Sequence, residues 1–85
     1  MKKMNKILYF TAPWCGPCKA LGPVMEELSH KIAIHKVNID NDTQKAAHYS
    51  VRSVPTLIMV DDSNNEIKRT VGNQSKQDIL NWYNG

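Results

Sequence analysis

Two neighbouring stretches near the N-terminus decide the fold of this chain, Ile7-Leu8-Tyr9-Phe10 and Trp14-Cys15-Gly16-Pro17-Cys18-Lys19. The first is an apolar run that predicts a buried strand, and the residues after the second follow the spacing of a helix. The two cysteines, the only ones in the chain, therefore lie at a strand-to-helix turn. Two thiols this close in sequence can close a disulfide and open it again at little entropic cost, as thiol–disulfide exchange requires.

Length and charge restrict the class of protein. The chain of 85 residues predicts a single domain, residues 1–85, with one modest core. The net charge of +3 comes from 11 basic and 8 acidic residues that are mostly scattered along the chain. This balance favours a solvated surface, and we expect no nucleic-acid partner.

The N-terminal lysines, Lys2, Lys3 and Lys6, precede an apolar run and so resemble the start of a signal peptide. A signal peptide needs about 7–15 apolar residues, whereas Thr11 and Pro13 interrupt this run. No later stretch approaches the roughly 20 apolar residues of a membrane span. We therefore expect a cytoplasmic protein with no membrane partner.

The first half of the chain predicts a strand, a helix, a second strand and a short helix. The first strand covers Lys6 to Thr11, and the helix covers Gly16 to about His30, because apolar residues recur there at steps of three and four. The β-branched segment from Ile32 to Asp40 suits the second strand. Asn41-Asp42-Thr43 offers N-cap chemistry for a short helix through Tyr49.

The second half predicts a hairpin and a last helix. Thr56 to Val60 is an apolar strand, Asp61 to Asn65 is a polar turn, and Glu66 to Val71 is the partner strand. Gly72-Asn73 breaks this strand, and Ser75 then caps the helix. The order β-α-β-α-β-β-α makes the first two strands parallel, with a right-handed crossover, and the hairpin antiparallel. We expect an α/β fold, a mixed four-stranded sheet flanked by helices.

The position of the cysteines assigns them different roles. At a helix N-terminus, Cys15 meets unpaired backbone N–H groups and the positive end of the helix dipole, which stabilise a thiolate. Cys15 would therefore attack a substrate disulfide, and Cys18, one turn further and less exposed, would resolve the mixed disulfide. Gly16 lets backbone approach, and Pro17 fits the first helical turn. Two ordinary buried cysteines are the alternative, which the Gly-Pro pair between a strand and a helix disfavours.

Four motifs resemble those of thioredoxins and follow one another in order: Trp14-Cys15-Gly16-Pro17-Cys18-Lys19, Val37-Asn38-Ile39-Asp40, Ser53-Val54-Pro55-Thr56-Leu57 and Val71-Gly72. The resemblance implies a thioredoxin fold with a cis Pro55 facing the cysteines. It implies that Val54 offers backbone N–H and C=O groups to a substrate, while Trp14 and Gly72 line the same docking surface. It also implies a monomeric protein-disulfide reductase that needs no cofactor besides its cysteine pair, with disulfide-containing proteins and a thioredoxin reductase as partners.

The chain departs from the thioredoxin pattern in two ways. The usual N-terminal strand and helix are missing, so we expect a minimal fold with its second strand at a sheet edge. Tyr9 stands where the family has a buried aspartate that is thought to deprotonate the resolving cysteine, and a phenol is a poor base at neutral pH. Lys36 matches the lysine that partners this aspartate. It either places positive charge near Cys18 or points to solvent.

Parts of the sequence also resemble proteins of three other functions. Cys15, Cys18, His30 and His35 resemble a zinc finger, but the 11 residues between the pairs are one too few and the helix begins at the cysteines, so we expect no metal. A glutathione-linked, glutaredoxin-like protein agrees in size, but the motifs are closer to thioredoxins. A non-enzymatic partner subunit would use only the surface around Trp14, Val54 and Gly72.

Overall fold

The computed structural model describes residues 5–85 of the chain, and its elements follow the predicted order. They are β1 (Lys6–Thr11), α1 (Gly16–Leu28), β2 (Ile34–Asn38), α2 (Thr43–His48), β3 (Thr56–Val60), β4 (Glu66–Val71) and α3 (Lys76–Asn84). Strands β1, β3 and β4 have the predicted bounds. Both expected caps are present, because Asp42 accepts a hydrogen bond from Lys45 N–H (3.0 Å) and Ser75 accepts one from Asp78 N–H (3.1 Å).

Two elements are shorter than the sequence predicted. Helix α1 ends at Leu28, because the chain turns there: Lys31 N–H and Ile32 N–H both donate to the Leu28 carbonyl, each at 2.9 Å. Ile32 is therefore buried in this turn and does not begin the strand. Strand β2 starts only at Ile34 and ends at Asn38, whose carbonyl accepts from the N–H groups of the following turn.

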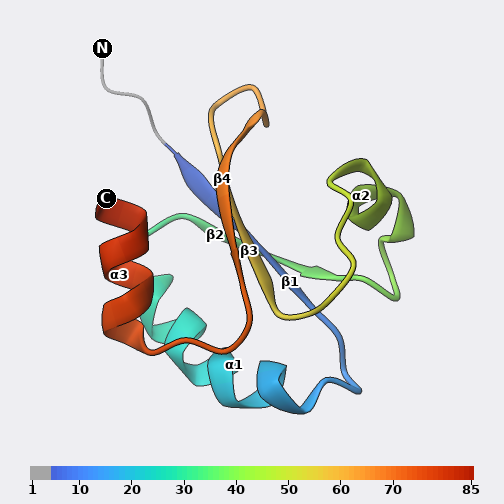
Figure 1. Ribbon diagram of the computed structural model, residues 1–85, viewed down its shortest axis with the longest axis horizontal. Coiled ribbons are helices and arrows are strands. Elements are labelled where there is room, and N and C mark those ends of the chain that lie inside the picture. The colour runs from blue at the N-terminus through green and yellow to red at the C-terminus, as the bar shows by residue number, and fades with distance from the viewer. Residues whose placement is uncertain (1–4) are drawn as a thin grey trace.

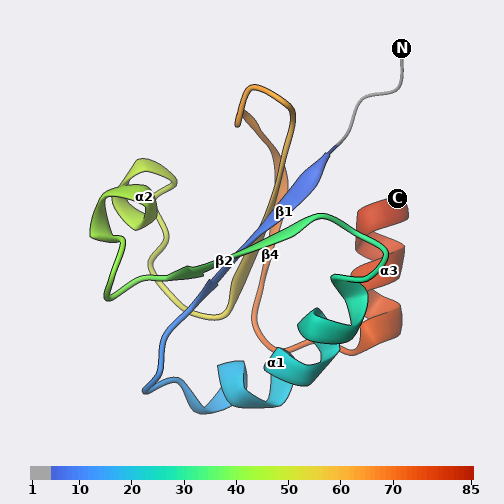
Figure 2. The ribbon, with the colours of Figure 1, turned by 180° about the vertical axis from the view of Figure 1, so that it is seen from behind.

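The sheet has the strand order β2-β1-β3-β4 (Figures 1 and 2). Strand β1 pairs with β2 in parallel and with β3 antiparallel, and β3 pairs antiparallel with β4. The mixed four-stranded sheet is confirmed, as is the expected edge position of β2 among residues 5–85. Helices α1 and α3 lie together on one side of the sheet, and α2 lies on the other (Figure 1).

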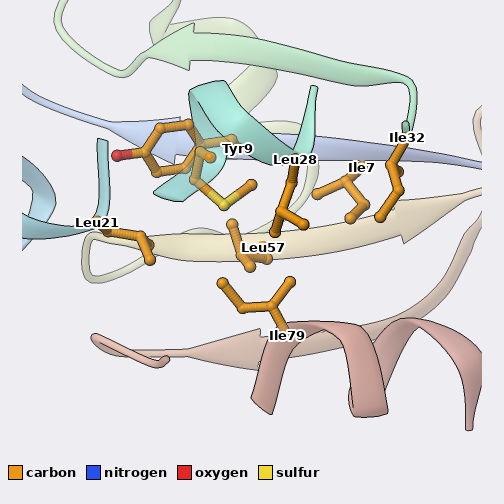
Figure 3. Packing of buried hydrophobic residues seen from close by; sticks show 8 residues of the cluster. Ile7, Tyr9, Leu21, Leu28, Ile32, Leu57 and Ile79 are labelled. Atoms are coloured by element: carbon orange, nitrogen blue, oxygen red, sulfur yellow. The ribbon is translucent and has the colours of Figure 1, made fainter. Parts of the chain in front are cut away.

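Alternate residues of β1 enter two separate cores, because both faces of the sheet are covered. Ile7 and Tyr9 pack with α1, α3 and Leu57 of β3, as Figure 3 shows. Leu8 and Phe10 pack on the opposite face against the α2 side. This double burial is why the strand reads as a continuous apolar run.

The sheet topology brings three distant segments to one end of the molecule. The C-terminal end of β1, which leads into the cysteines, lies beside the start of β3, because Phe10 pairs with Thr56. The start of β3 lies beside the end of β4, because Thr56 also pairs with Val71. The cysteine turn, the Pro55 segment and Gly72 therefore converge.

Candidate active site

The cysteines form a disulfide at the N-terminus of α1, with Cα atoms 5.3 Å apart. Cys15 is the N-cap residue, with extended backbone (φ −88°, ψ 112°), and its Sγ accepts a hydrogen bond from Cys18 N–H at 3.2 Å. Gly16 begins the helix and Pro17 occupies its first turn, as expected. No acidic residue lies in that turn, so no carboxylate of the turn would repel a thiolate at Cys15.

The expected difference in exposure between the cysteines is absent from this disulfide form. Cys15 is 4% exposed and Cys18 is 3% exposed. Both pack against Ala12, with Ile39 and Val54 beside them. The two positions differ in surroundings instead, since Gly16 and Pro17 beside Cys15 are exposed whereas Cys18 faces the core side of α1.

The loop before β3 lies directly against Cys15. The peptide bond between Val54 and Pro55 is cis, as the resemblance implied. The Cys15 Sγ lies 3.5 Å from the carbonyl oxygen of Val54. The N–H group of Gly72 donates to the Pro55 carbonyl at 2.9 Å. The backbone of Gly72 has a φ of +99°, a conformation that favours glycine. Val54, Pro55 and Gly72 thus form one unit beside the cysteines.

Exposed apolar side chains flank this unit. Trp14 is 66% exposed and Val71 is 54% exposed, so both present apolar surface next to this unit. The indole Nε1 of Trp14 donates to the Asp40 carboxylate, at 3.1 Å to Oδ2. Asp40 was not among the site residues predicted from the sequence. The position of Asp40 just after β2 could have indicated this contact, because the parallel strands β1 and β2 end at the same edge of the sheet.

Tyr9 lies on β1, packs in the cluster between the sheet and α1, and is buried, 3% exposed. Its hydroxyl donates to the carbonyl oxygen of Cys18 at 3.2 Å, and Figure 3 shows this hydroxyl pointing out of the apolar cluster. A cavity of about 320 Å³ adjoins this contact, and Tyr9, Cys18, Lys19 and Lys36 line it. Lys36 is exposed and shares this cavity wall with Cys18.

The zinc-finger arrangement does not form. Within residues 5–85, no group of three or more His, Cys, Asp or Glu side chains could hold a metal ion. His30 follows the end of α1 and His35 lies on β2, both exposed, while Cys15 and Cys18 are bonded to each other. In the same described part of the chain, no helix is long and apolar enough to cross a membrane.

Comparisons with known proteins agree with this arrangement. The thioredoxin family model matches residues 1–84. Thioredoxin of Chlamydia pneumoniae is 42% identical over 78 residues, covering 88% of this chain and 76% of that protein. Thioredoxin of Rickettsia typhi is 41% identical over 83 residues, covering 92% and 77%.

Solved structures show the same fold. A mutant thioredoxin from Halobacterium salinarum matches with a TM-score of 0.85 at 33% identity, covering 93% of this chain and 71% of that one. Fasciola hepatica thioredoxin matches with a TM-score of 0.87 at 29% identity, covering 98% and 81%. The family match along the chain, the shared fold and the disulfide at the start of α1 lead to one conclusion: this chain belongs to the thioredoxin family of thiol–disulfide oxidoreductases.

Proposed function

We propose that this protein reduces disulfides in protein substrates, with Cys15 as the nucleophile and Cys18 as the resolving residue. One contact supports the proposal most directly. The Cys15 Sγ, at the N-terminus of α1, lies against the Val54 carbonyl of the cis-proline loop. A substrate segment that pairs with the Val54 backbone would lie with its sulfur next to this sulfur and not next to Cys18.

The reaction proceeds in two exchanges. The Cys15 thiolate attacks one sulfur of the substrate disulfide, which forms a mixed disulfide and releases one substrate thiolate. The Cys18 thiolate then attacks the Cys15 Sγ, which releases the second substrate thiolate and forms the Cys15–Cys18 disulfide. Two electrons pass to the substrate. A thioredoxin reductase supplies two electrons, and with two protons from solvent these restore the Cys15–Cys18 dithiol.

The residues around the disulfide support these steps. The N-cap position and the Cys18 N–H group stabilise the Cys15 thiolate. Trp14 and the Val54-Pro55 loop with Gly72 form the docking surface, and the exposed Gly16-Pro17 segment leaves room for a substrate. On the inner side, Tyr9 holds the Cys18 carbonyl. Exposed Lys36 adds positive charge to the cavity behind Cys18, which favours the thiolate there.

The direction and the setting complete the proposal. The Gly-Pro pair between the cysteines resembles that of the reducing members of the family, and a reductase suits a cytoplasmic location, where thiols are kept reduced. We propose a monomer that acts alone on its substrates. A glutathione-linked activity is the competing function, and none of the contacts described above favours it.

Reduction of insulin tests the proposal, with dithiothreitol or thioredoxin reductase as the electron donor. We expect wild-type protein to accelerate insulin precipitation and Cys15→Ser to abolish the acceleration. Cys18→Ser should accumulate a mixed disulfide through Cys15, which peptide mapping by mass spectrometry identifies. Ser29→Ala, at the exposed end of α1, is the matched control and should keep full activity.

Three outcomes would contradict the proposal. If Cys15→Ser captured substrate through Cys18, the two roles would be reversed. If glutathione but not thioredoxin reductase sustained turnover, the glutathione-linked function would replace the proposed one. If Cys15→Ser kept full biological activity, the protein would be a binding partner rather than an enzyme.

A further inference from the structure

Among residues 5–85, one edge of β2 has no strand paired with it, and this edge lies away from the docking surface at the cis-proline loop. Within residues 5–85, β2 pairs only with β1 and forms one end of the sheet. An exposed strand edge presents unpaired N–H and C=O groups, and it can accept another strand. This edge lies beyond β1, on the opposite side of it from β3 and the Val54-Pro55 loop.

The hydrogen bonds to β1 fix which groups face outward. Ile7 N–H donates to the Ala33 carbonyl (2.9 Å), and Ile39 N–H donates to the Thr11 carbonyl (3.0 Å). Because alternate residues of a parallel strand bond to the same neighbour, the backbone groups of Ile34 and Lys36 point to the free edge. The N–H of Asn38 does so too, while its carbonyl is taken by the next turn.

A groove runs along this edge under α1. Two cavities, of about 320 and 260 Å³, share Tyr9, Gly22 and Lys36 as lining residues and so follow each other along the strand. The side chains of Ile34 and Lys36 lie on the same face of β2 as this groove, since both line it. An added strand would therefore place every second side chain in the groove.

The lining selects the chemistry of the added strand. Met25 and Ile34, together with Tyr9, give the cavity farther from Cys18 an apolar wall, which suits a β-branched side chain. Lys36 lines both cavities and Lys19 lines the one nearer Cys18, so the centre and that end are positively charged. Glu26 is the acidic lining residue and lies in the other cavity, at the Ser29 end.

We propose that the edge of β2 binds an extended segment of a partner protein that places an acidic side chain against Lys36 and an apolar side chain against Ile34. The charge argues against a second copy of this chain. Two copies of β2 paired antiparallel about Lys36 would set one Lys36 directly opposite the other, and like charges in that position are destabilising.

The test uses a cysteine-free peptide, Thr-Val-Thr-Glu-Thr-Val-Thr with blocked ends, which puts valine and glutamate on one face. Added to oxidised wild-type protein, it should shift the amide NMR signals of Ile34, Lys36 and Asn38 most strongly. It should also slow hydrogen exchange at the first two. A peptide with lysine in place of glutamate should bind about three- to tenfold more weakly, as expected for reversal of one partly exposed charge pair.

Protein variants test the charge from the other side. Lys36→Glu should reverse the preference, so that the lysine peptide binds more tightly than the glutamate peptide. Lys45→Glu is the matched control, because Lys45 lies on α2 across the sheet, and it should leave the preference unchanged. Peptides N-methylated at every second amide, made in both phases, should include one that no longer binds, because strand pairing needs those N–H groups.

Two results would overturn the proposal. The first is the absence of any shift at Ile34, Lys36 and Asn38 at millimolar peptide. The second is a set of shifts confined to Trp14, Val54 and Gly72, which would place the peptide on the other surface. Since the peptide carries no cysteine and the protein stays oxidised, either result leaves the proposed reductase function untouched.

Discussion

Tyr9 shows how one side chain is shared between the core and the site. Its ring packs with Leu21 and Met25 of α1, and its hydroxyl donates to the Cys18 carbonyl at 3.2 Å. The expectation from sequence was only that a phenol is a poor base. The structure gives the phenol a different task, because a donor at a backbone carbonyl fixes the first turn of the helix that carries Cys18.

Tyr9→Phe should lower the free energy of unfolding of the oxidised protein by about 0.5–1.5 kcal/mol, since it removes one buried hydrogen bond and leaves the Cys18 carbonyl with one partner fewer. Urea unfolding checks this value. Tyr83 is half-buried on α3, and Tyr83→Phe is the matched control. It should change the free energy of unfolding by less than Tyr9→Phe does. An equal loss in the two variants would mean that the Tyr9 hydroxyl contributes nothing particular.

Arg69 links strand β4 to the end of helix α2, although β3 separates the two elements in the chain. From β4 it donates to both carboxylate oxygens of Glu66, at 2.7 and 2.6 Å, and to the carbonyl of Tyr49 at the end of α2, at 2.6 Å. The hydrogen bonds from Arg69 hold the pKa of Glu66 below its usual 4.5. The hairpin is thereby tied to the helix on the same face of the sheet.

Glu66→Gln should lower the free energy of unfolding by about 0.5–1 kcal/mol at neutral pH, as for a well-formed surface ion pair. Because the folded-state pKa is lowered, the carboxylate contributes stability above its unfolded pKa and loses it as the pH falls through the folded pKa. The difference between wild type and variant should therefore vanish in acid. Urea titrations between pH 7 and about pH 3 measure it, with Asp62→Asn in the same hairpin as the control. An unchanged difference at the acid end would exclude the ion pair as its cause.

The whole molecule depends on a sheet that is buried on both faces by few helices. Strand β1 contributes Ile7 and Tyr9 to one cluster and Leu8 and Phe10 to the other, so neither face can unfold without disturbing the other. Helix α3 joins the first cluster through Ile79, its one fully buried residue. A chain of this length buries a limited apolar area, so each such contact is a large part of its stability.

Ile79→Ala should lower the free energy of unfolding by about 2–5 kcal/mol, because it opens a cavity between α3 and the sheet. Ile79→Val removes one methylene at the same place and should cost about 0.5–1.5 kcal/mol. Chemical unfolding followed by circular dichroism compares the two. A loss of less than about 1 kcal/mol in Ile79→Ala would show that α3 packs independently of this contact.

The sequence by itself determined the elements, their order and the pair of reactive residues. The strand and helix periodicities, the caps Asp42 and Ser75 and the Cys15–Cys18 spacing are all encoded within a few consecutive residues, where local backbone chemistry decides. The family resemblance added the cis Pro55, which base rates alone would not predict.

Only the tertiary structure decided how these parts meet. The contact of Cys15 with Val54 joins residues 39 positions apart, and the bond from Trp14 to Asp40 joins residues 26 positions apart. The near-equal burial of both cysteines and the groove beside β2 likewise depend on strand order and on the packing of α1. Such contacts arise from the free energy of the whole packed chain, and no short segment carries enough information to specify which distant segment will lie against it.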